Sequence, residues 1–227
     1  MAVLTKRFTE KRQCVVQPGG EKYLGLIIKH DCKAGTITIS AEDKIRDLLA
    51  IFGMQNCNPV STPAVPGSKL TKAPDIIDPE AQKIDVPSGA ASCLWIARFS
   101  RFDVLYQAKE LIKHMQNWTI EHVQALKHLL RYLKGTAHIP LTLRRGKPHY
   151  IKLAAYSDSD WAGYPENSNS PMCSTSGNVL YLVQIGAVYA QSVTQKTVAL
   201  STTEAETIAA CECVLRESVL VESFLRK

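Results

Sequence analysis

The spacing of hydrophobic residues changes along the chain, and this change predicts a protein that combines helices with antiparallel strands. A short apolar run at 23–28, turn residues at 31–35 and an alternating stretch at 36–40 predict a β-hairpin. Ser40 and Asp43 have the spacing of a capping box, which predicts that a helix follows directly. The apolar face of that helix and the glycine that ends it are Ile45, Leu48, Leu49, Phe52 and Gly53.

The middle of the chain is predicted to form a connector followed by three helices. Residues 58–89 hold six of the 11 prolines and show no hydrophobic period, which predicts an extended and flexible connector. A helical pattern covers 90–115 with one interruption, at which Asp103 can cap a second helix. A third helix is predicted at 119–134, because its first residue is a threonine suited to the N-cap and Gly135 can end it.

The last third of the chain changes to a strand period. Residues 151–157 alternate and lead into two aspartates, while 178–184 and 187–192 are β-rich runs joined by a short turn. Ser201 and Glu204 then form a second capping-box pattern, and neither glycine nor proline interrupts the sequence that follows. The predicted order is therefore three strands and a helix, which is an α/β (α+β) arrangement.

Composition places the chain among ordinary globular proteins rather than disordered or membrane proteins. The 227 residues are 45% hydrophobic and 21% charged, and the longest apolar stretch, at 179–190, is too short to span a bilayer. The seven cysteines are scattered without a CxxC pair, which favours neither a disulfide framework nor a zinc ribbon. We therefore expect an intracellular protein, cytoplasmic or nuclear, that does not enter a membrane.

Positive charge is concentrated in the middle of the chain. The net charge is +6, and residues 105–152 carry nine lysines and arginines against two glutamates, together with five of the six histidines. Such a concentration suits a polyanion such as nucleic acid. The cations that we predict to contact it form a stripe on one predicted helix and a pair after it; they are Lys127, Arg131, Lys134, Arg144 and Arg145. A solvated helix face would show the same pattern, so both interpretations stay open.

Carboxylates gather where one predicted strand ends and one predicted helix begins. Asp158 lies at the end of the strand, and Glu204 and Glu206 lie in the first turns of the helix. Converging carboxylates can hold Mg²⁺, and a pair of such ions stabilises both oxygens of an in-line phosphoryl displacement. Glutamates also favour helix N-termini because of the helix dipole, so a packed α/β domain without any ligand remains the alternative.

Three ordered motifs make this region resemble a known family. The strings YSDSDWAG at 156–163, CSTSGNVLYL at 173–182 and VALSTTEAETIAA at 198–210 closely resemble the ribonuclease H region of Pol polyproteins from copia-type LTR retrotransposons. Upstream, the segments at 23–31 and 45–66 resemble the end of the reverse-transcriptase palm and the thumb of the same polyprotein. The segment HVQALKHLLRYLKGT resembles the part that joins polymerase to nuclease.

The resemblance implies a fold, a division of the chain and a metal site. It implies an incomplete ribonuclease H-like fold preceded by a β-hairpin and a helical thumb and connection region. It divides the chain into the palm end and thumb start (1–57), a Pro-rich connector (58–89), a helical connection segment (90–150) and a truncated ribonuclease H-like domain (151–227). Asp158 and Glu206 match catalytic, Mg²⁺-binding positions of the family, whereas Asp160 and Trp161 match positions with a structural role.

Departures from the family pattern set the expected function. No aspartate follows Asp160, although the family needs further carboxylates, and the Asp pair of the polymerase is absent. We therefore expect a retrotransposon-derived Pol fragment whose region acts on an RNA/DNA hybrid within the full polyprotein and which is inactive as this chain. The alternative is a non-catalytic module, a relic or a co-opted host protein, that binds nucleic acid or another protein, including through an open sheet edge.

Overall fold

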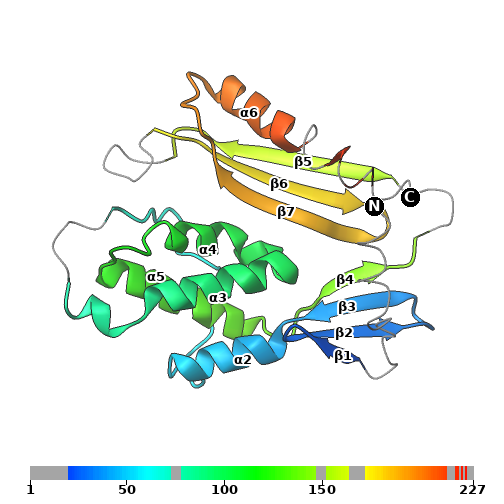
Figure 1. Cartoon of the computed structure of the whole chain (residues 1–227), viewed down its shortest axis with the longest axis horizontal. Coiled ribbons are helices and arrows are strands. Elements are labelled where there is room, and N and C mark those ends of the chain that lie inside the picture. The colour runs from blue at the N-terminus through cyan, green and yellow to red at the C-terminus, as the bar shows by residue number, and fades with distance from the viewer. Residues whose placement is uncertain are drawn as a thin grey trace, which may run out of the picture.

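Two antiparallel sheets and five α-helices make up the part of the chain that the structure describes (Figure 1). The structure is a computed structural model, and it describes residues 20–72, 78–146, 152–163 and 172–213, together with residues 218, 219, 221 and 223. This confirms the predicted mixture of helices and antiparallel strands. Within these residues, no helix has both the length and the apolar character needed to cross a bilayer.

The first sheet contains the predicted hairpin and two strands that the sequence pattern did not predict. Its order is β1 (Glu21–Tyr23), β2 (Leu26–Asp31), β3 (Thr36–Ser40) and β4 (Leu141–Arg144), all antiparallel. The apolar run 23–28, expected to be one strand, is divided by Leu24 and Gly25, which have φ of 50° and 84°. A left-handed pair of this kind turns the chain, so the run supplies parts of two strands.

The first helix, α2 (Glu42–Ile51), lies where the pattern predicted it but is capped differently. Its N-cap is Ala41, with no side-chain cap, and Ser40 Oγ accepts a hydrogen bond from the Glu42 backbone N–H at 3.2 Å. The expected capping box is therefore wrong, because Ser40 is still the last residue of β3. Gly53 follows the helix with φ of 64° and donates to Ala50 O, which confirms the predicted stop.

The predicted helical region at 90–115 forms two helices with the expected interruption. These are α3 (Val86–Phe99) and α4 (Leu105–Ile112), separated by the 3₁₀ turn η2 (Phe102–Val104). Asp103 was expected to cap α4, and this is wrong. It instead accepts hydrogen bonds from Arg101 at 2.7 and 3.0 Å and from Tyr132 Oη at 2.8 Å. Burial opposes ionisation of Asp103, but these donors outweigh it and lower its pKa.

The longest helix, α5 (Ile120–Gly135), confirms the prediction from its N-cap onward. Thr119 forms a capping box with His122, whose Nδ1 accepts from the Thr119 backbone N–H at 3.1 Å. Gly135 is the last helical residue and has no left-handed conformation. A Cβ added there would lie 2.9 Å from Pro59 Cβ, so close packing of the connector is what favours glycine.

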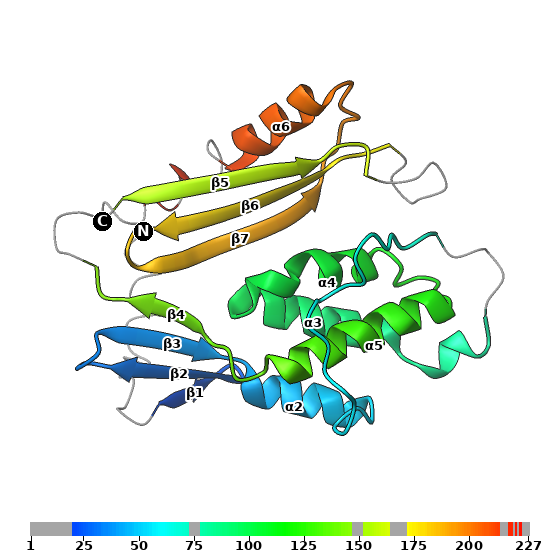
Figure 2. The same cartoon turned by 180° about the vertical axis from the view of Figure 1, so that it is seen from behind.

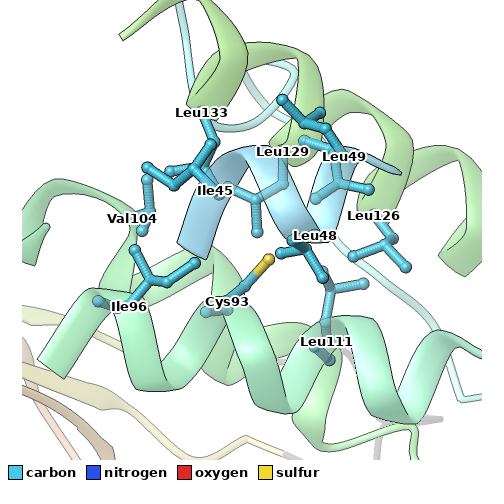
Figure 3. Close-up of a cluster of buried hydrophobic side chains, with 14 of the residues drawn as sticks. Ile45, Leu48, Leu49, Cys93, Ile96, Val104, Leu111, Leu126, Leu129 and Leu133 are labelled. Carbon is cyan, nitrogen blue, oxygen red and sulfur yellow. The ribbon is translucent and has the colours of Figure 1, made fainter. Parts of the chain in front are cut away.

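One hydrophobic core joins the first sheet to helices α2 to α5 (Figure 3). The apolar faces of α2, α3 and α5 meet there, and Leu126, Leu129, Leu130 and Leu133 of α5 are fully buried. Leu26 of β2 and Ile45 of α2 belong to the same cluster as the α5 leucines. Described residues of the predicted divisions 1–57 and 90–150 therefore share one core, and residue 89, where the predicted connector ends, lies inside α3.

The first part of the Pro-rich connector, at 58–72, is irregular as predicted, but it is held against α5. Arg131 Nε donates to Asn58 O at 2.7 Å, His128 Nε2 lies 3.0 Å from Thr62 O, and Lys134 Nζ donates to Cys57 O. These side chains supply hydrogen-bond donors to backbone carbonyls that would otherwise need water, because this segment is part of no helix or sheet. A short 3₁₀ turn, η1 (Ala81–Lys83), precedes α3.

The second sheet and the last helix have the predicted order of three strands and a helix. The sheet order is β5 (Leu153–Asp160), β6 (Thr175–Leu182) and β7 (Gly186–Thr194). Helix α6 (Thr202–Cys211) begins at the predicted cap, where Ser201 Oγ accepts from the Glu204 backbone N–H at 3.2 Å. Figures 1 and 2 show α6 on one face of this sheet and the helical layer beneath the other.

Candidate functional site

Asp158 lies on the face of the second sheet that points away from α6. In β6, Ser176, Asn178 and Leu180 are buried on the α6 side, whereas the residues between Gly177 and Tyr181 that alternate with them are more exposed. Asp158 pairs with Gly177, and both line a hollow opposite α6. The predicted catalytic aspartate is therefore exposed at the wall of a cavity.

Glu206 approaches the same strand from the helix. Its Oε1 accepts a hydrogen bond from the Ser159 backbone N–H at 3.3 Å. Among the described residues β5 pairs only with β6, so this N–H lies on the open edge of the strand. The structure thus brings Glu206 to the residue next to Asp158, but by way of the backbone and not by direct contact between the carboxylates.

Asp158 and Glu206 are too few carboxylates to hold a pair of divalent ions. Asp158 and Glu206 offer carboxylate oxygens, which Mg²⁺ prefers, and both side chains are exposed. Within the described ranges, no three acidic, histidine or cysteine side chains converge well enough to hold an ion. An ion here would keep most of its water shell, as Mg²⁺ commonly does.

The residues around these carboxylates have structural contacts. Glu204 Oε2 accepts from the Leu200 backbone N–H at 2.7 Å, which gives it a capping role. Trp161 Nε1 donates to Ala199 O at 3.0 Å and so ties the end of β5 to the loop before α6. Asp160 lies 3.9 Å from Lys69 Nζ, which also donates to Gly163 O at 2.7 Å.

Sequence reasoning missed a buried glutamine that joins the sheet to α6. Gln195 is 1% exposed, and its Nε2 donates to Ser176 Oγ at 3.1 Å and to Ala205 O at 2.9 Å. Both hydrogen bonds come from the amide nitrogen, whereas the buried Oε1 has no partner within the described part of the chain. Through these two bonds Gln195 helps to position the first turns of α6, which carry Glu206, although nothing in the local pattern distinguishes it.

The predicted cationic stripe on α5 has partners within the molecule. Arg131 donates to Asn58 O and Lys134 to Cys57 O, at the start of the connector and just before it, whereas Lys127 is exposed. Arg144 and Arg145 are both exposed at the end of β4, with backbone N–H groups held by Ile185 O at 2.8 Å and Gly35 O at 2.7 Å. Contact of any of the five with nucleic acid stays a prediction.

Other cations of the basic segment are inside the protein. Glu110 Oε1 lies 3.0 Å from Lys109 Nζ and 3.4 Å from Lys113 Nζ, and all three side chains are largely buried. Burial lowers the pKa of Lys113 to about 8, although Glu110 opposes this effect. The total charge of residues 105–152 therefore overstates the cations that can meet a polyanion.

A groove crosses the exposed face of the second sheet. A hollow of about 740 Å³, lined by Arg144 and Ala154 among others, shares Tyr156, Val179 and Tyr181 with a second hollow of about 640 Å³ that reaches Asp158. We call this continuous depression the sheet groove, and the residues that define it are Arg144, Ala154, Tyr156, Asp158, Val179 and Tyr181. Ala154, Tyr156 and Asp158 alternate along β5, but alternation could not show that the helical layer leaves their face partly open.

Comparison with known proteins identifies the family. The chain is 33% identical over 211 residues to the retrovirus-related Pol polyprotein from transposon TNT 1-94 of Nicotiana tabacum, which covers 91% of this chain and 15% of the relative. It is 36% identical over 170 residues to the corresponding polyprotein from transposon RE1 of Arabidopsis thaliana, covering 74% and 11%. The chain belongs to the Pol polyproteins of copia-type LTR retrotransposons. It thus spans a small part of the length of these relatives.

A further relative has a different name. The chain is 45% identical over 91 residues to the secreted RxLR effector protein 161 of Plasmopara viticola, covering 40% of this chain and 59% of that protein. No family model matches the chain, and no solved structure matches it. The family assignment therefore rests on similarity to the polyproteins and confirms the resemblance of the three motifs.

Proposed function

We propose that this chain is the junction between reverse transcriptase and ribonuclease H of a Pol polyprotein, acting on RNA/DNA hybrids within the complete protein. In this proposal β5, β6, β7 and α6 form the front half of a ribonuclease H-like domain. The observation that carries it is the hydrogen bond from Ser159 to Glu206, because it brings the helix carboxylate beside the strand position of Asp158. The order of three strands and a helix, with Asp158 on the first strand, also supports it.

Asp158 and Glu206 would hold Mg²⁺, which, when bound, supplies charge stabilisation for a phosphoryl oxygen. Two carboxylates can retain one hydrated ion weakly, whereas two-ion hydrolysis needs further fixed oxygens. We therefore expect a polypeptide of these 227 residues to bind a divalent ion weakly and to leave RNA/DNA hybrids uncut. In the complete polyprotein, other residues would have to supply the missing ligands.

Two measurements test this proposal. Titration of the 227-residue chain with Mn²⁺, followed by electron paramagnetic resonance, should show binding that weakens in Asp158→Asn and in Glu206→Gln. The matched control is Asp47→Asn, which removes an exposed carboxylate of α2 and should leave binding unchanged. Hydrolysis of a labelled hybrid should be absent at millimolar Mg²⁺, and cleavage that disappears in Asp158→Asn would contradict the expected inactivity.

A non-catalytic binding module is the second candidate, and the small donor set favours it for this chain. Asp158 and Glu206 are only two ligands, and no group of three acidic, histidine or cysteine side chains that could hold an ion occurs within the described residues. Equal Mn²⁺ binding by the parent chain, Asp158→Asn and Glu206→Gln would remove the metal site and leave this second function.

A further inference from the structure

The sheet groove exposes aromatic rings that a folded sheet would ordinarily cover. Tyr156 is 62% exposed and Tyr181 is 40% exposed, and their rings meet edge to face at 5.9 Å between centroids. Their cross-strand partners are Val179 and Ala154, which are too small to cover the ring faces. Two large amphipathic rings therefore present π surface to solvent on the floor of the groove.

The two ends of the groove differ in charge. Arg144 lines one end, and its backbone is fixed between β3 and the turn after β6, because it pairs with Thr36 and donates to Ile185 O at 2.8 Å. Asp158 and Asp160 line the other end. A phosphate would be attracted to the arginine, and it would be repelled by the aspartates unless a cation neutralises them.

We propose that the sheet groove binds a single nucleic-acid strand, whose bases stack on Tyr156 and Tyr181 and whose phosphate meets Arg144. Unpaired bases expose the faces that aromatic side chains stack against, whereas the faces of paired bases are covered within a duplex. Stacking on a tyrosine ring does not depend on the hydrogen-bonding edge of the base, so binding should be independent of sequence. The inference rests on the proposed function in one respect, namely that the strand would lead towards Asp158.

This groove is a better candidate than the predicted stripe on α5. Arg131 and Lys134 of the stripe already donate to the carbonyls of Asn58 and Cys57, and each would have to give up that acceptor to bind a phosphate. Arg144 is exposed at the rim of a hollow that also contains stacking surface. Cationic and aromatic side chains together are the combination that binds single strands.

The test is fluorescence anisotropy of a labelled oligothymidylate of about 12 nucleotides, a length within the range that single-strand sites span, measured in EDTA. Tyr156→Ala and Tyr181→Ala should each weaken binding by about 5- to 150-fold, which is the loss expected for one stacked base. Tyr156→Phe keeps the ring and should retain the affinity. Tyr23→Ala removes an exposed tyrosine of β1 and is the matched control. Arg144→Ala should lower the salt slope by about 0.7, the value for one phosphate of a single strand.

The outcomes separate this inference from the proposed metal site, because EDTA removes divalent ions from the binding assay. A chain that binds Mn²⁺ at Asp158 but does not bind the oligonucleotide at low salt overturns the groove inference alone. Equal affinity of the parent and Tyr156→Ala also overturns it. A third contrary result is a dimer, seen in gel filtration, that is lost in Tyr156→Ala while the oligonucleotide has no effect on the parent. A second copy of the chain would then cover the groove. Binding that weakens in both alanine variants, with Mn²⁺ binding absent, supports the groove and removes the metal site.

Discussion

Acid should destabilise this protein through a histidine pair at the junction of α4 and α5. His114 is 5% exposed and His122 is 0% exposed, and their ring centroids lie 4.2 Å apart. Burial, with a further contribution from His122, lowers the pKa of His114 from 6.5 to about 4. Glu110 opposes this decrease, and Lys113 adds to it.

The sign and size of the effect follow from linkage. A lowered pKa means that the unfolded chain binds the proton more tightly, so the stabilisation is complete above pH 6.5 and is lost as pH falls towards about 4. The full difference between the His114 pKa values of the unfolded and folded states corresponds to about 3 kcal/mol of unfolding free energy. About 2 kcal/mol of this is lost between pH 7 and pH 5. Carboxylates remain largely ionised at pH 5, so this interval isolates the histidines.

Urea denaturation at pH 7 and pH 5 measures the effect as a difference between variants. His114→Gln removes the titrating ring and should reduce the loss of unfolding free energy between the two pH values by about 2 kcal/mol. His138→Gln removes an exposed histidine and is the matched control. Identical pH dependence of the parent and His114→Gln would refute the assignment of acid sensitivity to this pair.

Three further predictions concern the packing of the helical region. Leu126→Ala empties a fully buried position between α3 and α5 and should cost about 2 to 5 kcal/mol in urea denaturation, whereas an exposed site such as Gln124→Ala should change little. Gly53→Ala places a side chain at φ of 64° and should lower unfolding free energy by about 1 kcal/mol, which a thermal melt would detect. The connector at 58–72 should resist limited proteolysis, and Arg131→Ala should speed its cleavage; equal rates in both chains would contradict the role of the carbonyl contact.

The sequence was sufficient where one segment decides its own structure. Helix α5 has an apolar face and a final glycine within its own 16 residues and its N-cap directly before them, so the local pattern alone predicts it. The hairpin of β6 and β7 follows from two β-rich runs and a short turn for the same reason. The alternation at 151–157 likewise predicted the strand β5 that leads into Asp158, because side chains in a strand repeat every two residues.

Prediction failed where distant segments compete for the same polar group. Asp103 has the right spacing to cap α4, yet Arg101 and Tyr132 bind it, and the tyrosine lies 29 positions away. The strand β4 has only four residues and pairs with β3 across about a hundred positions, so no local period could identify it. The partners of Arg131 and Lys134 are backbone carbonyls, which sequence patterns do not reveal.

Two lysines of the helical half of the molecule reach the end of the second sheet that carries Asp158 and Asp160. Lys69 of the connector contacts Gly163 and lies near Asp160, and the buried Lys109 of α4 donates to Thr175 Oγ1 at 3.4 Å. Both lysines therefore come from the helical half and reach the end of the sheet where β5 finishes and β6 begins. The exposed pair of Lys69 and Asp160 contributes little to stability by itself. Its effect is to bring a positive charge near the mouth of the sheet groove, where it partly offsets the repulsion between the aspartates and an incoming phosphate.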